Sequence, residues 1–328
     1  MKKLVSLILS LIMVLSLSAC GASEDDLYAL YSDDTNVVNT DIGEYVLGQT
    51  MPLLTESKIC VVNSDQLSAD EKLTCKAAIV VDITNNTFIQ GQDVFTQVYP
   101  ASVTKLLTAL VIIRHGNLDD FYTVKEDNCG ITEEGAQLMG FKAGDQIQVK
   151  DLLYCLLLYS GNDAAVALAD YYSGSESEFC NVLNQEAKNI GCLGTHYVNA
   201  HGLHSESHYT TAYDQYIVLR NLMEYDIFQT ISQTVDYEFT YLNAAGEYVS
   251  MPVSTTNRFK TGAYSLPEGT TILGAKTGNT YAAGSCLIQC IETSDGTQYI
   301  IGIFGEPDNQ SLYEQHQYLI QKVEDLAQ

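Results

Sequence analysis

Apolar residues follow two different spacings along the chain, and the change of spacing divides it into regions. Residues 77–92 contain two runs rich in β-branched residues on either side of Asn85-Asn86, which predicts a β-hairpin. From Asn117 to about Tyr225 the apolar residues recur every three or four positions, as in DLLYCLLLY and DAAVALADYY, which is typical of helices. Strands therefore come first, and a mostly helical region follows.

Strand-like segments return after Asp236 as ILGAKTG, SCLIQCIET and TQYIIGIFG, and Asp295-Gly296 between the last two is a hairpin signal. Ser311 and Glu314 resemble a capping box ahead of an apolar stripe, so a final helix is predicted there. Strands at both ends of a helical middle predict an α+β fold. We expect an antiparallel sheet flanked by helices, with an inserted all-helical subdomain at about 117–235.

The first residues have the pattern of an export signal. Lys2 and Lys3 precede an apolar run that ends in LSAC at 17–20, which predicts a signal peptide over residues 1–19. LSAC resembles a bacterial lipobox, and this resemblance implies that Cys20 is lipidated and anchors an extracytoplasmic protein to the cell membrane. Residues 21–57 carry eight acidic residues and no basic one, so residues 20–58 are interpreted as an acidic tether and 59–328 as the catalytic domain.

The composition of the chain restricts the classes of molecule that it can bind. The net charge of −25 disfavours binding to nucleic acid or to anionic lipid headgroups, so the membrane contact is assigned to the lipid. A hydrophobic content of 46% is enough for a large core. Eight cysteines remain after Cys20, an even number that permits disulfides in an exported protein without fixing their pairing.

The segment YPASVTKLLTAL at 99–110 places a hydroxyl and a cation together in an apolar helix predicted from about Ser102 to His115. Ser102 and Lys105 are three residues apart, so their side chains lie on one helix face. Burial and the positive end of the helix both lower the pKa of a lysine, which could then remove the proton from Ser102. S-x-x-K alone is weak evidence, because a snorkelling lysine beside a surface serine explains it equally well.

Two further motifs follow in the chain. Ser160-Gly161-Asn162 lies between two helical segments, where glycine breaks the helix and exposes a hydroxyl and a carboxamide. AKTGNT at 275–280 ends a predicted strand. Each motif alone is weak, and SGN could be a plain helix–helix turn.

The three motifs in this order form the signature of penicillin-binding proteins and serine β-lactamases. PASVTKLLTAL, LLLYSGNDAAVALA, NAHGL, TTAYD, TNR and AKTGNTYAAGSC resemble the serine D-Ala-D-Ala carboxypeptidases, the low-molecular-mass penicillin-binding proteins, over roughly residues 75–305. Many relatives continue into a β-rich domain, whereas this chain ends in one helix, so positioning at the wall is expected to depend on the tether. The resemblance implies the same α+β fold, with the site between sheet and helices, and it implies no metal and no cofactor.

The resemblance also implies roles for individual residues. Ser102 would be the acyl-enzyme nucleophile, Lys105 its general base and Ser160 a proton relay, while the backbone N–H groups of Ser102 and Asn279 would form the oxyanion hole. The remaining candidates would bind the D-Ala-D-Ala end of a peptidoglycan stem peptide, and β-lactams would be covalent inhibitors. These substrate-binding candidates are Asn162, Lys276, Thr277, Gly278 and Asn279.

Three alternatives are considered. A class A β-lactamase needs a further glutamate for deacylation, and Glu186 is the nearest approach but has the wrong spacing. A D,D-endopeptidase or transpeptidase of the same fold stays open. A zinc peptidase is disfavoured, because His201, His204 and His208 lie in a loop without the i, i+4 spacing of a helical metal site.

Overall fold

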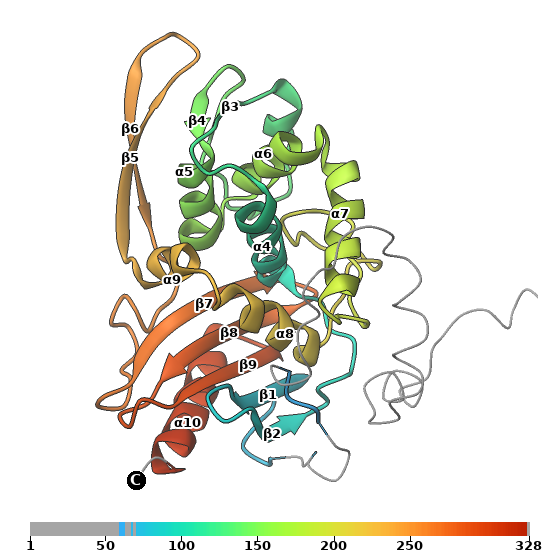
Figure 1. Cartoon of the computed structure of the whole chain (residues 1–328), viewed down its shortest axis with the longest axis vertical. Coiled ribbons are helices and arrows are strands. Elements are labelled where there is room, and N and C mark those ends of the chain that lie inside the picture. Colours follow the sequence, from blue (N-terminus) through green and yellow to red (C-terminus); the bar gives the residue numbers. More distant parts are fainter. Residues whose placement is uncertain (1–58, 63–66, 68–69, 327–328) are drawn as a thin grey trace, which may run out of the picture.

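In a computed structural model, the chain is described at residues 59–62, 67 and 70–326, and the expectations for the signal peptide, Cys20 and the tether lie outside these residues. The described part divides into a sheet and a mainly helical region stacked upon it, with strand β7 nearest to the helices (Figure 1). The α+β fold class predicted from the sequence is confirmed.

The main sheet has five antiparallel strands in the order β2-β1-β9-β8-β7. Two of its hairpins are the predicted ones, around Asn85-Asn86 and Asp295-Gly296, and a third joins β7 to β8. The strands are β1 (Ala77–Asp82), β2 (Thr87–Gln92), β7 (Thr271–Thr280), β8 (Gly284–Glu292) and β9 (Gln298–Glu306).

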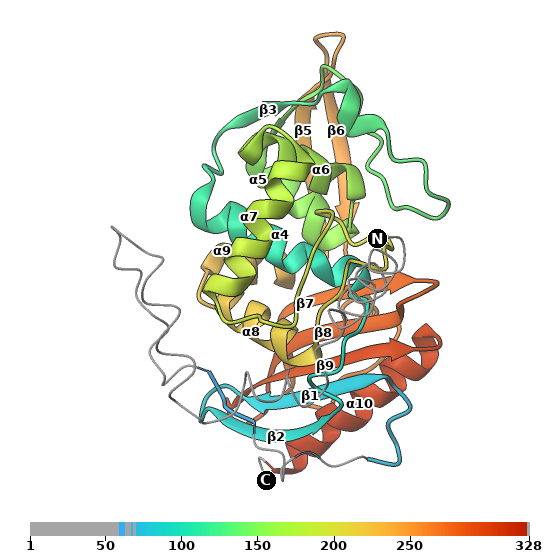
Figure 2. The same ribbon diagram turned by 90° about the vertical axis from the view of Figure 1, so that its right-hand side faces the viewer.

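Both faces of this sheet are covered. Helix α10 (Asn309–Leu326) lies along one face, where Leu319 and Ile320 pack on Ile301 and Ile303 (Figure 2). Side chains on the other face of the strands belong to the large core shared with the helical region. Central strands buried on both faces read as continuous apolar runs, which is why IIGIF and CLIQCI show no clean alternation.

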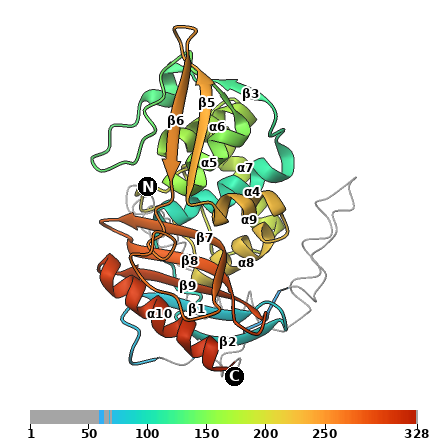
Figure 3. The ribbon, with the colours of Figure 1, turned by 90° about the vertical axis from the view of Figure 1, so that its left-hand side faces the viewer.

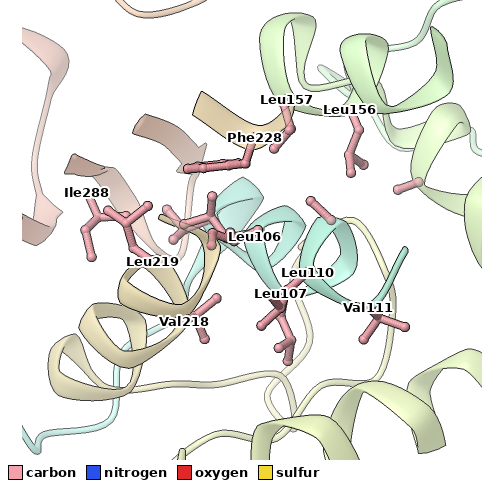
Figure 4. Packing of buried hydrophobic residues seen from close by; sticks show 14 of the residues in the cluster. Leu106, Leu107, Leu110, Val111, Leu156, Leu157, Val218, Leu219, Phe228 and Ile288 are labelled. Carbon is pink, nitrogen blue, oxygen red and sulfur yellow. The ribbon is translucent and has the colours of Figure 1, made fainter. Parts of the chain in front are cut away.

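The helical region is built around α4 (Lys105–His115), whose Leu106, Leu107, Leu110 and Val111 are fully buried. Figure 4 shows these side chains among leucine, valine and phenylalanine side chains from the surrounding elements and Ile288 of the sheet. The other helical elements are the 3₁₀ turn η2 (Ala101–Thr104), the 3₁₀ turn η3 (Glu126–Cys129), α5 (Val149–Tyr154), the π-helical turn η4 (Cys155–Tyr159), α6 (Asn162–Ser173), α7 (Glu176–Asn189), α8 (Ala212–Leu222) and α9 (Asp226–Gln233).

The inserted region is not helical throughout, which corrects the expected all-helical subdomain. It holds two three-residue strands that join a hairpin into a second antiparallel sheet, in the order β3-β4-β5-β6. The hairpin extends away from the main sheet (Figure 3). Strands this short show almost no alternation, so only the pairing reveals them. They are β3 (Phe121–Thr123), β4 (Gln146–Gln148), β5 (Asp236–Leu242) and β6 (Tyr248–Ser254).

The start of the last helix also differs from the expectation. Helix α10 begins at Asn309, two residues before Ser311, and the Asp308 carboxylate accepts the Ser311 backbone N–H at 2.8 Å. Asp308 therefore caps the helix, because a carboxylate just before the first turn accepts a free N–H and interacts favourably with the positive end of the helix dipole. Helix α8 is capped by Thr211, whose side chain accepts the Asp214 N–H at 3.0 Å.

Candidate active site

Ser102 lies in the 3₁₀ turn η2 and not in the α-helix that the sequence predicts. The preceding Ala101 has φ of +47°, a left-handed conformation that is unfavourable for a residue with a Cβ, and it prevents an α-helix from beginning earlier. Residues three apart eclipse one another in a 3₁₀ turn, so Ser102 and Lys105 meet directly. Lys105 Nζ is 3.0 Å from Ser102 Oγ.

Lys105 is fully buried at the first residue of α4. Besides Ser102, its Nζ contacts Asn162 Oδ1 at 2.7 Å and the His201 carbonyl at 2.6 Å. Burial and then the nearby Lys276 ammonium hold the pKa of Lys105 well below its usual range, while the Asp163 carboxylate opposes them. A neutral amine beside a serine hydroxyl can act as a general base.

Ser160 ends the π-helical turn η4 and has φ of +71°, also in the left-handed region. Such turns and strained residues recur at functional sites, because the surrounding structure must hold them. Here the turn directs the Ser160 hydroxyl toward β7, where Lys276 Nζ donates to it at 3.0 Å. Lys276 is buried, and this burial lowers its pKa from 10.5 to about 7.

Strand β7 brings the third motif directly against η2. A Cβ at Gly278 would lie 2.9 Å from the Pro100 carbonyl and 3.0 Å from the Ser102 nitrogen, so only glycine allows this approach. Thr277 Oγ1 is 2.8 Å from Thr256 Oγ1. The Asn279 side chain donates to Ser285 Oγ at 2.8 Å, which ties this side chain to the neighbouring strand.

The three motifs therefore converge at the junction of η2, η4 and β7. Hydrogen bonds connect Ser102, Lys105 and Asn162 into one group. Lys276 and Ser160 form a second group, and the charge of Lys276 lowers the pKa of Lys105 in the first. Three participants were missed in the sequence: the His201 carbonyl, Asp163 and Thr256. Asp163 could have been noticed, since an acidic residue directly after SGN falls in the first turn of a helix.

The three histidines of the loop have structural partners. His201 Nδ1 accepts the Leu203 N–H at 3.1 Å, His208 Nε2 contacts Thr104 Oγ1 at 2.8 Å, and His204 packs edge-on against Tyr99. Burial lowers the pKa of both His201 and His208 to about 3. Within residues 59–62, 67 and 70–326, no group of three or more His, Cys, Asp or Glu residues is placed to hold a metal ion.

The eight cysteines of the described part are free thiols. Cys155 is buried in η4, and Cys286 and Cys290 are buried in β8.

Among the described residues, no helix combines the length and the apolar character that a membrane span requires.

The family model described as D-alanyl-D-alanine carboxypeptidase, peptidase S11, matches residues 63–307 of this chain. The chain belongs to this family. The match covers all three motifs and both sheets, so the resemblance noticed in the sequence is confirmed at the level of the family.

Individual relatives of this D-alanyl-D-alanine carboxypeptidase family agree. The chain is 29% identical over 216 residues to D-alanyl-D-alanine carboxypeptidase DacF of Bacillus subtilis, which covers 65% of this chain and 52% of the relative. It is 29% identical over 233 residues to DacD of Escherichia coli, covering 69% and 56%. The chain thus spans between half and two thirds of the length of these curated relatives.

Solved structures share the fold. A single-residue variant of Streptomyces K15 DD-transpeptidase superposes with a TM-score of 0.70 at 24% identity, over 76% of this chain and 97% of the other. DacD of Francisella tularensis gives a TM-score of 0.67 at 23% identity, over 77% and 71%. At this identity the likeness establishes the fold alone.

Proposed function

We propose that this chain is a serine D-Ala-D-Ala carboxypeptidase, which removes the terminal D-Ala from peptidoglycan stem pentapeptides through an acyl-enzyme on Ser102. The observation that carries the proposal is Lys105, a fully buried amine of lowered pKa 3.0 Å from the Ser102 hydroxyl. The names of the family's relatives support the choice of substrate.

Acylation begins when neutral Lys105 takes the proton from Ser102 Oγ, which then attacks the carbonyl carbon of the D-Ala–D-Ala bond. The oxyanion is held by the backbone N–H groups of Ser102 and Asn279, on two segments that Gly278 keeps in contact. The C–N bond then breaks, and the leaving amine receives through Ser160, which Lys276 contacts, the proton that Lys105 took from Ser102, so that Lys105 is neutral again. Lys105 next takes a proton from the water that attacks the ester, and returns it to Ser102 Oγ as the ester C–O bond breaks.

The substrate-binding groups fit an extended peptide that ends in a carboxylate. β7 is an edge strand of its sheet, so a peptide can pair alongside it. Thr277, Thr256 and Lys276 would contact the terminal carboxylate, while the Asn162 carboxamide would bind the peptide amide.

Three other activities of this fold, those of a class A β-lactamase, a D,D-endopeptidase and a transpeptidase, are distinguished by experiment. A class A β-lactamase needs a carboxylate that activates water, but Glu186 on α7 is engaged by Arg114 in an ion pair. Glu176, on the first turn of α7, accepts the Ala200 N–H at 2.9 Å and so holds the loop that carries His201. A D,D-endopeptidase or transpeptidase would use the same acyl-enzyme with a different acceptor or peptide.

The deciding experiment supplies the purified protein with a pentapeptide stem mimic that ends in D-Ala-D-Ala, and measures free D-alanine. Release that depends on Ser102 supports the proposal. Transfer of the peptide to an added D-amino acid with little hydrolysis would instead support the transpeptidase, and cleavage of cross-linked dimers alone would support the endopeptidase.

We further propose an extracytoplasmic location with a lipid anchor on Cys20, on the strength of LSAC at 17–20. A single acyl chain holds a protein to a membrane only weakly, so firm anchoring through Cys20 requires more than one chain. Cys20→Ala should move the protein out of the membrane fraction or leave an uncleaved precursor. Unchanged fractionation without lipid mass on the mature N-terminus would contradict the anchor.

A further inference from the structure

Asp163 follows the SGN motif directly and is buried, with 5% of its surface exposed. None of the ion pairs found among the described residues involves it, so its carboxylate is stabilised by hydrogen bonds to backbone. Its Oδ1 accepts the N–H groups of Met139 at 2.9 Å and Ala164 at 3.0 Å, and its Oδ2 accepts the Gly140 N–H at 2.8 Å. A buried carboxylate is retained only where such donors replace water.

These contacts bind the loop at 130–145 to the catalytic motif. The Asn162 N–H donates to the Gln137 carbonyl at 2.8 Å, and a Cβ built on Gly161 would lie 3.0 Å from Met139 Cγ. Each residue of Gly161-Asn162-Asp163 therefore touches the loop. The loop and the motif form one unit, although 20 to 30 residues separate them in the sequence.

Asp163 influences Lys105, the partner of Ser102, in two ways. Asn162, the residue beside it, holds Lys105 Nζ with its carboxamide oxygen at 2.7 Å. The carboxylate also acts on the charge of Lys105 and raises its pKa, against the effect of Lys276. His201 and His208 of the neighbouring loop are near enough for the charge of Lys105 to lower their pKa, and burial, the larger cause, brings both to about 3, so both are neutral at pH 7.

We propose that Asp163 is a positioning residue, which fastens residues 137–140 to the SGN turn and thereby fixes Asn162 against Lys105. This inference rests on the proposed acyl-enzyme on Ser102. Its two parts, the fastening and the charge, can be tested apart because the chain offers a matched control for each.

The first comparison is Asp163→Asn with Asp145→Asn. Asp145 is also buried and also accepts two backbone N–H groups, from Lys142 at 2.9 Å and Ala244 at 3.0 Å, but at the far end of the same loop. We expect acylation of Ser102 by penicillin to slow by about ten- to a hundredfold in Asp163→Asn, the effect of losing hydrogen bonds to a charged group. Asp145→Asn should melt at a lower temperature and keep a rate close to that of the wild type.

The charge is tested by the pH profile of the same acylation rate. Without the carboxylate, the pKa of Lys105 falls further, so the rise of the rate with pH should move to lower pH in Asp163→Asn. A purely structural defect lowers the rate at every pH and leaves the position of this rise unchanged.

The fastening is tested from the loop side with Gly140→Ala and Gly135→Ala. Both glycines have φ near +80° and open space where a Cβ would be, so alanine strains both backbones equally. Of these two glycines, only Gly140 donates its N–H to Asp163. Gly140→Ala should slow acylation without moving the pH profile, while Gly135→Ala should match the wild type. The comparison of these two glycine variants also tests the proposed fastening if Asp163→Asn does not fold.

An equal rate and an unmoved profile in Asp163→Asn would overturn the inference, as would equal effects of Gly140→Ala and Gly135→Ala. In either case a wild-type protein that forms the penicillin adduct leaves the proposed function intact. Absence of any adduct in the wild type would overturn the proposed function, and this inference with it.

Discussion

Lys276 Nζ donates a hydrogen bond to Ser160 Oγ at 3.0 Å, across 116 residues of sequence and between a π-helical turn and a sheet strand. The bond joins the two halves of the molecule at the candidate site. It also places a second amine near Lys105, whose pKa is lowered by burial and then by the charge of Lys276, whereas burial alone lowers the pKa of Lys276. The site therefore contains two amines whose charged forms are disfavoured in the folded protein.

Lys276→Met should change the dependence of stability on pH. The pKa of Lys276 is about 7 in the folded protein and 10.5 ordinarily, so between these values the unfolded chain binds a proton that the folded chain does not. The contribution of Lys276 to the free energy of unfolding of the wild type is therefore lower at pH 7 and rises toward pH 10. The melting temperature of Lys276→Met minus that of the wild type should fall as pH rises from 7 to 10.

Lys142→Met is the control, because Lys142 is exposed. The melting temperature of Lys142→Met minus that of the wild type should stay constant over the same pH range. A constant difference for Lys276→Met as well would show that Lys276 keeps its proton in the folded protein. Lys276→Met also loses the hydrogen bonds that Lys276 Nζ donates to Ser160 Oγ and to the Thr277 carbonyl, and this loss shifts the difference in melting temperature by a fixed amount without changing its slope with pH.

Ser102→Ala should abolish covalent labelling by penicillin. The ring amide of a β-lactam mimics the scissile bond, so the wild type should gain the intact mass of the drug on the peptide that contains Ser102, as seen by mass spectrometry after digestion. Ser160→Ala serves for comparison, since it removes a hydroxyl next to the reaction and leaves the nucleophile in place. An adduct that persists in Ser102→Ala would identify another nucleophile.

Lys105→Ala should slow this labelling by about 10²–10⁴-fold, the usual contribution of a general base. The wild-type rate should rise with pH as Lys105 loses its proton, and this rise should begin well below the ordinary pKa of lysine, because burial and Lys276 lower it. Labelling measured from pH 5 to 10 gives the profile. A rate that is independent of pH in the wild type would exclude Lys105 as the base.

Much of the site could be predicted because its chemistry is carried by short motifs. Ser102 and Lys105 lie within one turn, and the spacing alone puts their side chains together. The strands β8 and β9 and their Asp-Gly turn could also be predicted, since local turn chemistry fixes such a hairpin.

The rest depends on contacts between distant residues. Strands β3 and β4 consist of three residues each and become recognisable only when β5 pairs with them. The left-handed conformations of Ala101 and Ser160 leave no trace in the sequence, because neither residue type favours them. Asp163 looked like an ordinary acidic residue in a first helical turn, and its link to Met139 and Gly140 comes from a loop without periodicity.

The lifetime of the penicillin adduct should distinguish a carboxypeptidase from a β-lactamase. Both form an ester on Ser102, and they differ in how water removes it. With the peptide substrate, the D-Ala leaving group departs and opens space for water beside Lys105. With penicillin, the leaving group stays attached to the ester and blocks that space, and Glu186 is occupied by Arg114 and cannot activate water from elsewhere. We therefore expect D-alanine release from a pentapeptide together with an adduct that lasts for minutes or longer, followed by mass spectrometry after removal of free drug. Rapid turnover of penicillin without D-alanine release would reject the carboxypeptidase and favour the β-lactamase.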